Sequence, residues 1–283
     1  MIVGIDLGTT NSLVGVYQDG QVKLIPNAFG EYLTPSVVAL DDNDQIIVGK
    51  IAKERLVTHP DRTLSQFKRF MGTKHELILG NRTYKAEELS SFVIRKLVDD
   101  AETYLGEKVE EVIVSVPAYF NDAQRYATKL AGQFAGVKIE RIINEPSAAA
   151  LAKRSMSNQE DQSFVVVDFG GGTLDISVVE LFDNVVEIVS IAGDNRLGGE
   201  DFTAAIAEEF LASNQLSKKS ISREFYSKIL VQAEKAKLNL NINEEVQMLV
   251  MDQEKEYSLD LTYQRFYELC QPLLARLKYV LDR

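Results

Sequence analysis

Two short segments of the chain combine an aspartate with a turn of glycines and threonines. Asp6-Leu-Gly-Thr-Thr10 and Asp168-Phe-Gly-Gly-Gly-Thr173 each lie between two apolar, β-rich runs. Carboxylate oxygens are preferred ligands of Mg²⁺, whereas glycine turns expose backbone N–H groups that hold phosphate, with threonine hydroxyls as further donors. We therefore expect the two turns to face one ligand, a magnesium nucleotide.

The repetition of this pattern is more informative than either copy. A single Asp-Gly-Thr turn also occurs in hairpins, so the first copy does not distinguish a structural turn from a phosphate site. Consecutive glycines cost roughly 1 kcal/mol per residue relative to alanine in regular structure, so the run Gly170, Gly171 and Gly172 indicates a functional requirement. The Gly-x4-Gly-Lys-Ser/Thr pattern of a P-loop does not occur. A Rossmann turn is not expected, because both turns are flanked by predicted strands.

Phosphoryl transfer also requires a cation near the γ-phosphate and a carboxylate that orients the attacking water. Glu145 follows a predicted strand and opens a predicted helix, a position from which a carboxylate can point into a cleft. From the residues alone, a helix-capping glutamate is the simpler interpretation of Glu145, and a solvated helix lysine is the simpler interpretation of Lys68. The pattern of residues leaves both roles open.

The elements that must position these residues alternate between strand and helix. Residues 2–40 are predicted to be mostly strands with a hairpin turn at Asp19-Gly20, and the pattern becomes helical from Lys50 until Gly72. Further along, the spacing predicts helices over 87–105, from 122 to near 136 and after Glu145, and strands over 112–116 and 139–143.

The second glycine turn begins a similar succession. We expect a surface loop over 155–162, strands on both sides of the turn and over 185–192, helices over about 200–213 and 222–239, and a hairpin over 246–261. Thr262 is predicted to cap a final helix. Its apolar spacing continues to Arg283 without a stop signal, which favours a truncated chain.

Composition excludes several classes of partner. The chain has 283 residues, is 45% hydrophobic and carries a formal net charge of −11. That length allows a large core and predicts two domains. The acidic balance argues against nucleic acid as the main partner, because a phosphate backbone requires a basic surface. No signal peptide and no apolar run of about 20 residues is present, so we expect a cytoplasmic protein without a membrane partner.

The few cysteines and histidines do not predict a metal or thiol site. Cys270 is the only cysteine, so no intrachain disulfide can form, and its helical, amphipathic surroundings predict a small buried residue. His59 and His75 are far from any cysteine and from any partner at metal-ligand spacing, and both are expected to be exposed loop residues.

Taken in order along essentially the whole chain, the motifs resemble the ATPase domain of the DnaK-type heat-shock chaperones, the heat-shock seventy family. Phe29–Pro35 and Glu88–Ser91 are most similar to the HscC-like branch of that family. The other segments that carry the resemblance are Ile5–Ser12, Phe67–Arg69, Val114–Asp122, Ile143–Ala149, Val167–Asp175, Ala192–Asp194, Leu197–Phe202 and Glu234–Lys237.

The resemblance implies an α/β, actin-like ATPase fold of two RNase-H-like lobes. Lobe I would cover 1–145, and lobe II would cover 146–283 and be incomplete at its C-terminal end. It also implies ATP or ADP with Mg²⁺ as cofactors. In the full-length protein, hydrolysis would be coupled to binding of unfolded client peptides, with a J-domain co-chaperone and a nucleotide exchange factor as partners. The peptide-binding domain is expected to be absent from this chain.

The resemblance also implies individual roles. Asp6 and Asp168 would hold hydrated Mg²⁺, and Lys68, Glu145, Asp168 and Thr173 would act in catalysis. The residues that would bind the phosphates and the nucleoside are Gly8, Thr9, Thr10, Asn11, Gly170, Gly171, Gly172, Thr173, Gly198, Gly199, Glu234, Lys237 and Asn241.

Two more positions would be allosteric, and two depart from the family. Pro117 and Arg125 lie where the family transmits the nucleotide state to its peptide-binding domain. Leu238 stands where the family usually has an arginine that stacks on adenine, and Phe169 replaces the usual leucine of the second turn.

Three other functions are compatible with such a fold. The chain could be a nucleotide-sensing module with little turnover, a filament-forming actin-like protein or a sugar kinase. The segments Asn144–Ala149 and Leu197–Phe202 favour the chaperone over the filament.

Overall fold

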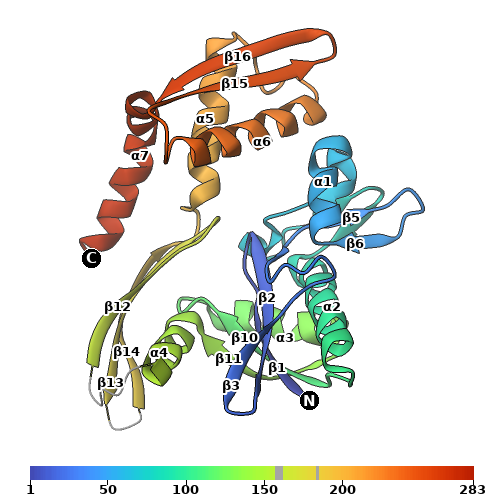
Figure 1. Cartoon of the computed structure of the whole chain (residues 1–283), viewed down its shortest axis with the longest axis vertical. Helices are drawn as coiled ribbons and strands as arrows, with labels where there is room; N and C mark the ends of the chain where they lie inside the picture. The colour runs from blue at the N-terminus through green and yellow to red at the C-terminus, as the bar shows by residue number, and fades with distance from the viewer. Residues whose placement is uncertain (157–161, 183–184) are drawn as a thin grey trace.

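The structure is a computed structural model that describes residues 1–156, 162–182 and 185–283. It is a mixed α/β protein, as predicted, with several separate sheets and helices packed on them (Figure 1). Within these described ranges, no helix has the length and apolar character needed to cross a membrane.

The largest sheet is formed by the N-terminal part of the chain. It has the strand order β11-β10-β1-β2-β3, and a short strand, β4, pairs with β2 outside this path. β1, β2 and β3 are antiparallel neighbours, whereas β10 and β11 run parallel to β1. The strands are β1 (Ile2–Asp6), β2 (Asn11–Gln18), β3 (Gln21–Ile25), β4 (Thr34–Pro35), β10 (Glu111–Val116) and β11 (Lys138–Asn144).

Two helices complete this layer, α2 (Ala86–Leu105) and α3 (Asp122–Phe134). Both bury apolar side chains in the main hydrophobic core together with β1, β2 and β10. The predicted ends are confirmed, because Gly106 closes α2 at φ 71° and the Asn121 side chain accepts a hydrogen bond from the Gln124 N–H at the start of α3. Local capping chemistry therefore sets where these helices stop and start.

Between β4 and α2 the structure differs from the helical pattern predicted over 50–72. Helix α1 covers only Lys50–Thr58, because the residue before Pro60 disfavours helical backbone. The rest consists of short pieces: β5 (Val38–Leu40), β6 (Ile46–Val48), η1 (Pro60–Arg62), β7 (Thr63–Leu64), the 3₁₀ turn η2 (Phe67–Phe70), β8 (Leu77–Leu79) and β9 (Arg82–Tyr84). The β8–β9 pair was not predicted.

The second copy of the repeated motif forms its own antiparallel sheet. β12 (Gln162–Phe169), β13 (Leu174–Phe182) and β14 (Val185–Asp194) follow one another in order, as β1, β2 and β3 do. Helix α4 (Glu145–Met156) packs beside this sheet. The predicted strand–turn–strand repeat is thus confirmed, whereas the loop predicted over 155–162 falls largely on 157–161, outside the described residues.

The C-terminal part forms a further compact layer with a separate core. The predicted helices, hairpin and final helix are confirmed, and Thr262 caps the last helix by accepting the Arg265 N–H. Cys270 is buried in that helix, as predicted, and burial raises the pKa of its thiol to about 11. The elements are α5 (Gly199–Ser213), α6 (Arg223–Asn239), β15 (Glu245–Asp252), β16 (Lys255–Thr262) and α7 (Tyr263–Leu281).

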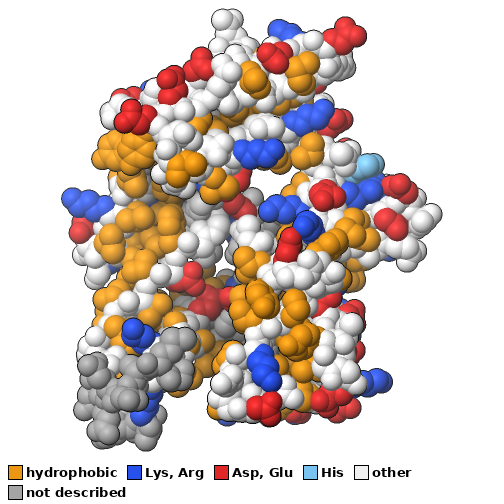
Figure 2. All heavy atoms as spheres, in the orientation of Figure 1, with side chains coloured by type: hydrophobic (Ala, Val, Ile, Leu, Met, Phe, Trp, Pro, Cys, Tyr) orange, Lys and Arg blue, Asp and Glu red, His pale blue; other side chains and the backbone are white. Residues whose placement is uncertain are grey.

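These parts surround a central hollow. In Figure 1, β12–β14 and α7 lie on one side, β1–β3 on the other, and α5 and α6 lie above, where α6 packs against α1. The space-filling view in Figure 2 shows the hollow, with acidic side chains gathered at its edge. The glycine turns lie between these layers, so their mutual position depends on tertiary packing.

Candidate functional site

The carboxyl ends of three parallel strands provide the first set of site residues. Asp6, the last residue of β1, pairs in register with Ser115 of β10, and Val116 of β10 pairs with Asn144 of β11. The residues that leave these strands therefore emerge at one edge of the sheet. Ligands of open α/β sheets are usually bound at this edge.

The two glycine turns meet face to face. A Cβ added to Gly171 would lie 2.0 Å from Thr10 Oγ1, and one added to Gly172 would lie 2.7 Å from Thr9 Cγ2. Glycine at both positions is therefore required for this close approach.

The first turn is held by short internal contacts. The Gly8 N–H donates to Ser12 Oγ at 3.1 Å, and Ser36 Oγ donates to the Gly8 carbonyl at 2.8 Å. A Cβ on Gly8 would lie 2.0 Å from the carbonyl oxygen of Asn11, the first residue of β2. Only glycine fits at this position.

The start of α5 is docked on the second turn. The Gly199 N–H donates to the Gly170 carbonyl at 3.0 Å, and the Glu200 N–H donates to the Gly171 carbonyl at 2.9 Å. A Cβ on Gly198 would lie 2.4 Å from the Gly171 carbonyl oxygen. The positive end of the helix dipole is thus placed beside both turns, a favourable position for anions.

Lys68 and Glu145 form a buried ion pair at 3.3 Å, although they are 77 residues apart. Their side chains are only 8% and 16% exposed. Burial raises the pKa of Glu145, while the charge of Lys68 opposes this shift. Lys68 comes from η2 and Glu145 from the first residue of α4. The lysine is therefore a buried cation beside a buried carboxylate and not a solvated helix residue.

Further carboxylates gather near this pair. Asp6 accepts a hydrogen bond from Ser115 Oγ at 3.0 Å, and desolvation together with the charge of Asp6 raises the pKa of Asp168. Burial, followed by the charges of Glu145 and Asp168, raises the pKa of Asp175 to about 7. Among the described residues, neither carboxylate oxygen of Asp175 has a hydrogen-bond partner. This concentration of negative charge suits a divalent cation.

The arrangement of these groups favours Mg²⁺ bound through water. In the described residues, no group of three or more His, Cys, Asp or Glu side chains is arranged as a direct metal cage. Mg²⁺ characteristically keeps several water ligands and uses only one or two carboxylates. Asp6 and Asp168, on opposite turns, fit that mode of binding.

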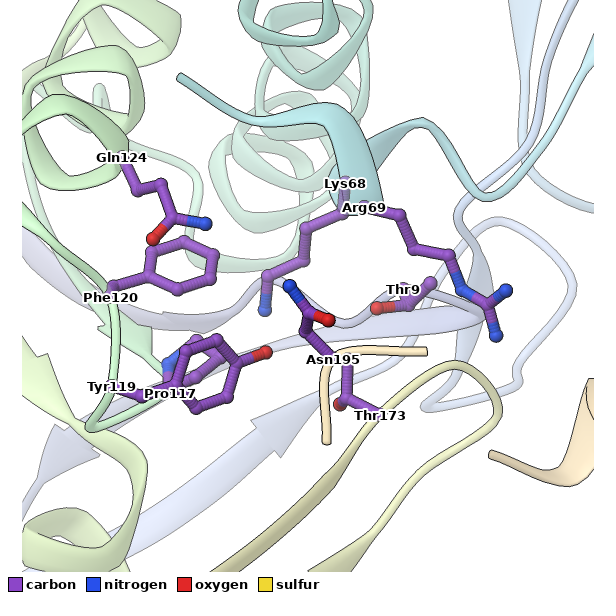
Figure 3. A pocket seen from close by; sticks show the side chains of 9 residues that line it. All are labelled: Thr9, Lys68, Arg69, Pro117, Tyr119, Phe120, Gln124, Thr173 and Asn195. Atoms are coloured by element: carbon purple, nitrogen blue, oxygen red, sulfur yellow. The ribbon is translucent and has the colours of Figure 1, made fainter. Parts of the chain in front are cut away.

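A small cavity of about 10 Å³, close to the volume one water molecule requires, lies beside the ion pair. Figure 3 shows Lys68 directed towards Phe120 and Tyr119, while Arg69 extends past Thr9 in the other direction. Burial, followed by the charge of Asp175, raises the pKa of Tyr119, so its hydroxyl stays protonated. The lining residues are Thr9, Lys68, Arg69, Pro117, Tyr119, Phe120, Gln124, Thr173 and Asn195.

Five of the lining residues were absent from the predicted site: Arg69, Tyr119, Phe120, Gln124 and Asn195. Asp175, whose charge acts on Tyr119, was absent as well. Tyr119 follows the carboxyl end of β10, and this position at a parallel strand end is a signal that could have identified it. Asp175 pairs in register with Asp168, which β-strand alternation across a hairpin could have indicated. No sequence signal distinguishes Asn195.

The two positions predicted to be allosteric lie close together, Pro117 after β10 and Arg125 on α3. Pro117 lines the cavity. Arg125 donates to the Phe120 carbonyl at 2.9 Å and to Asn144 Oδ1 at 2.8 Å. It thus connects the 117–120 segment to the residue before Glu145.

The predicted nucleoside residues are only partly brought together. Lys237 Nζ donates to the Gly199 carbonyl at 2.8 Å and pairs with Glu234 at 2.7 Å, which places both beside the start of α5. Asn241 lies beyond the end of α6, exposed, in a groove of about 660 Å³ between α6, β15 and the start of α7. Leu238 is 55% exposed.

We predict that Asp175→Asn increases stability more at pH 8 than at pH 5, by about 2 kcal/mol in free energy of unfolding. The folded-state pKa of Asp175, about 7, is above its ordinary value of 3.8. Its favourable contribution is therefore complete below pH 4 and is lost as the pH rises through 7. Urea unfolding in EDTA at both pH values tests this, with the exposed Glu107→Gln as control. An equal effect of Asp175→Asn at both pH values would contradict it.

Comparison with known protein families agrees with this geometry. A family model described as Hsp70 protein matches residues 2–79 and 75–283. The matched ranges include both glycine turns, the Lys68–Glu145 pair and the start of α5. Because the match extends over nearly the whole chain, the chain belongs to the Hsp70 family.

Proposed function

We propose that this chain binds and hydrolyses Mg-ATP as the nucleotide-binding part of a DnaK-type chaperone. Members of the Hsp70 family are ATPases. The observation that carries the proposal is the contact between the two glycine turns beside the Lys68–Glu145 pair and the Asp6, Asp168 and Asp175 carboxylates.

The proposed architecture is actin-like, with RNase-H-like lobes over 1–145 and 146–283. The support is internal repetition, because β1–β2–β3 and β12–β13–β14 are antiparallel meanders with an aspartate and a glycine turn at the same point. Each proposed lobe then contributes one phosphate turn. A change in the angle between the lobes would change the distance between the turns.

In the proposed mechanism, the backbone N–H groups and hydroxyls of the two turns position the phosphates. Mg²⁺, held through water by Asp6 and Asp168, would supply charge neutralisation. Lys68 would stabilise the charge on the γ-phosphate, and Glu145 would orient the attacking water. Thr173 and Lys68 both line the water-sized cavity, which supports a shared role at the γ-phosphate. Phosphoryl transfer depends on such positioning rather than on covalent chemistry.

In a longer protein, we propose that hydrolysis controls the affinity for unfolded client peptides in the cytoplasm, with a J-domain co-chaperone and an exchange factor. Pro117 and Arg125 would transmit the nucleotide state. Arg125 supports this role because it bonds both to the cavity-lining segment and to Asn144, next to Glu145. An HscC-like branch is the finer assignment that Phe29–Pro35 favours.

A second candidate is a nucleotide-sensing module with little turnover. The exposed Leu238 favours it, because a leucine beside Glu234 and Lys237 cannot provide the stacking and charge of an arginine. Weaker adenine contacts would leave binding dominated by the phosphates. Comparing binding with single-turnover hydrolysis distinguishes the two candidates.

We expect isothermal titration calorimetry to show ATP binding that weakens at least about ten-fold when EDTA removes Mg²⁺, because unscreened phosphates then face several carboxylates. Asp6→Asn combined with Asp168→Asn should reduce this dependence on Mg²⁺, whereas the exposed Glu107→Gln should retain it. Absence of ATP and ADP binding at millimolar nucleotide, in a chain shown to be folded, would contradict the proposed function.

A further inference from the structure

Two side-chain contacts join the first turn and η2 to the start of α5. Thr10 Oγ1 donates to Glu200 Oε1 at 3.2 Å, and Arg69 pairs with Asp201 at 3.2 Å. The partners are 190 and 132 residues apart in the sequence. Both contacts therefore connect parts of the molecule that must separate for phosphate to enter between the turns.

The contacts engage the same groups that phosphate would use. The Thr10 hydroxyl donates to a carboxylate oxygen of Glu200. The Arg69 guanidinium donates to the carboxylate of Asp201. Carboxylate and phosphate oxygens accept from the same donors, so the α5 carboxylates occupy places that a phosphate would compete for.

The contacts also leave buried polar atoms without partners. Glu200 Oε2 and Arg69 Nε have no hydrogen-bond partner among the described residues. Buried polar atoms without partners are unfavourable, so this closed arrangement is not fully satisfied internally. An incoming phosphate oxygen could accept the hydrogen bond that Arg69 Nε does not make here.

We propose that Glu200 is an autoinhibitory residue that holds the Thr10 hydroxyl in the closed cleft and must release it when nucleotide phosphate binds. This inference rests on the proposed function and adds to it a residue that opposes binding. Glu200 acts through Thr10 and not on the reacting atoms.

Electrostatics strengthens the competition. Glu200 faces the charged side chains of Arg69, Asp201 and Glu234. Lys237 lies nearby, where its Nζ donates to the Gly199 carbonyl. Burial raises the pKa of Glu200 to about 7. An ionised Glu200 repels phosphate, whereas a protonated one does not. The inhibition should therefore grow as the pH rises from 6 to 8.

Glu200 can be tested more cleanly than Asp201. Asp201 accepts the Gly198 N–H at 2.8 Å and caps α5, so its replacement would also disturb the helix. The side chain of Glu200 has no such role. Glu208, exposed on the same helix, provides a matched control.

Calorimetric titration with Mg-ADP should compare wild type with Glu200→Ala, Glu200→Gln and Glu208→Ala at pH 6 and pH 8. We expect Glu200→Ala to bind at least about five-fold tighter at pH 8, the factor of one ordinary hydrogen bond. Glu200→Gln loses the charge but keeps an acceptor for Thr10, so it should bind tighter than wild type by a smaller factor. The gain should be smaller at pH 6, and Glu208→Ala should match wild type. Unchanged or weaker binding by both Glu200 variants, with wild type still binding, overturns this inference but not the proposed function.

A second measurement does not depend on nucleotide binding. Spin labels at the exposed positions Lys53→Cys on α1 and Lys219→Cys before α6, with Cys270→Ala, report how far α1 separates from α6, which pack against each other in this structure. Without nucleotide, Glu200→Ala should shift the distance distribution to longer values. An unchanged distribution in a folded Glu200→Ala variant would show that Glu200 does not hold the cleft closed.

Discussion

Lys68→Ala is expected to lower the rate of ATP hydrolysis by about 10²–10³-fold, the usual effect of removing one preorganised charge-stabilising group. Mg-ATP affinity should change by less than about ten-fold, because the backbone of the two turns still holds the phosphates. The loss should be mainly in turnover, since Lys68 is buried at 3.3 Å from Glu145 and its replacement leaves that carboxylate without its cation. Single-turnover hydrolysis of prebound Mg-ATP is the appropriate measurement.

Two controls separate catalysis from folding. Removing one partner of a buried ion pair is destabilising, so thermal unfolding must show that Lys68→Ala remains folded at the assay temperature. Glu145→Gln keeps the shape of the side chain and should also reduce turnover more than binding, whereas the exposed Lys53→Ala should retain wild-type values. Unchanged turnover in both site variants would contradict the assigned roles.

Gly198→Ala is expected to abolish measurable Mg-ATP binding and to lower the free energy of unfolding by about 1–3 kcal/mol, the usual cost of overpacking. The added methyl group would lie 2.4 Å from the Gly171 carbonyl oxygen and from the Gly172 nitrogen. These neighbours are backbone atoms and cannot rotate away. The start of α5 must therefore leave the second turn, and the phosphate donors lose their alignment.

The control for this prediction is Gly4→Ala on β1, where the added methyl group would find its nearest neighbour at 3.9 Å, an ordinary contact. That variant should bind Mg-ATP as wild type does. Calorimetry and urea unfolding on both variants provide the test. Wild-type affinity in Gly198→Ala would show that the docking of α5 on the turn is not needed for nucleotide binding.

The features predicted from the sequence are those encoded by neighbouring residues. The glycine turns, the strands beside them and the cap at Thr262 follow from local backbone preference and side-chain hydrogen bonds. The short strands β7, β8 and β9 were missed because two or three residues carry too little periodicity, and their pairing partners decide their conformation. The helical pattern predicted over 50–72 was wrong beyond Thr58, because Pro60 disfavours helical backbone in the residue before it.

By itself, the sequence determined which chemical groups the site contains, namely paired aspartates and glycine–threonine turns, the kinds of group that suit a hard cation and a phosphate. Only the tertiary structure decided how these groups meet. It pairs Lys68 with Glu145 and packs Gly171 against Thr10. It also brings Glu200 within hydrogen-bond distance of Thr10 in the first turn. The physical reason is that side-chain type and backbone preference are local properties. Contacts between residues 77 to 190 positions apart arise from the packing of whole layers.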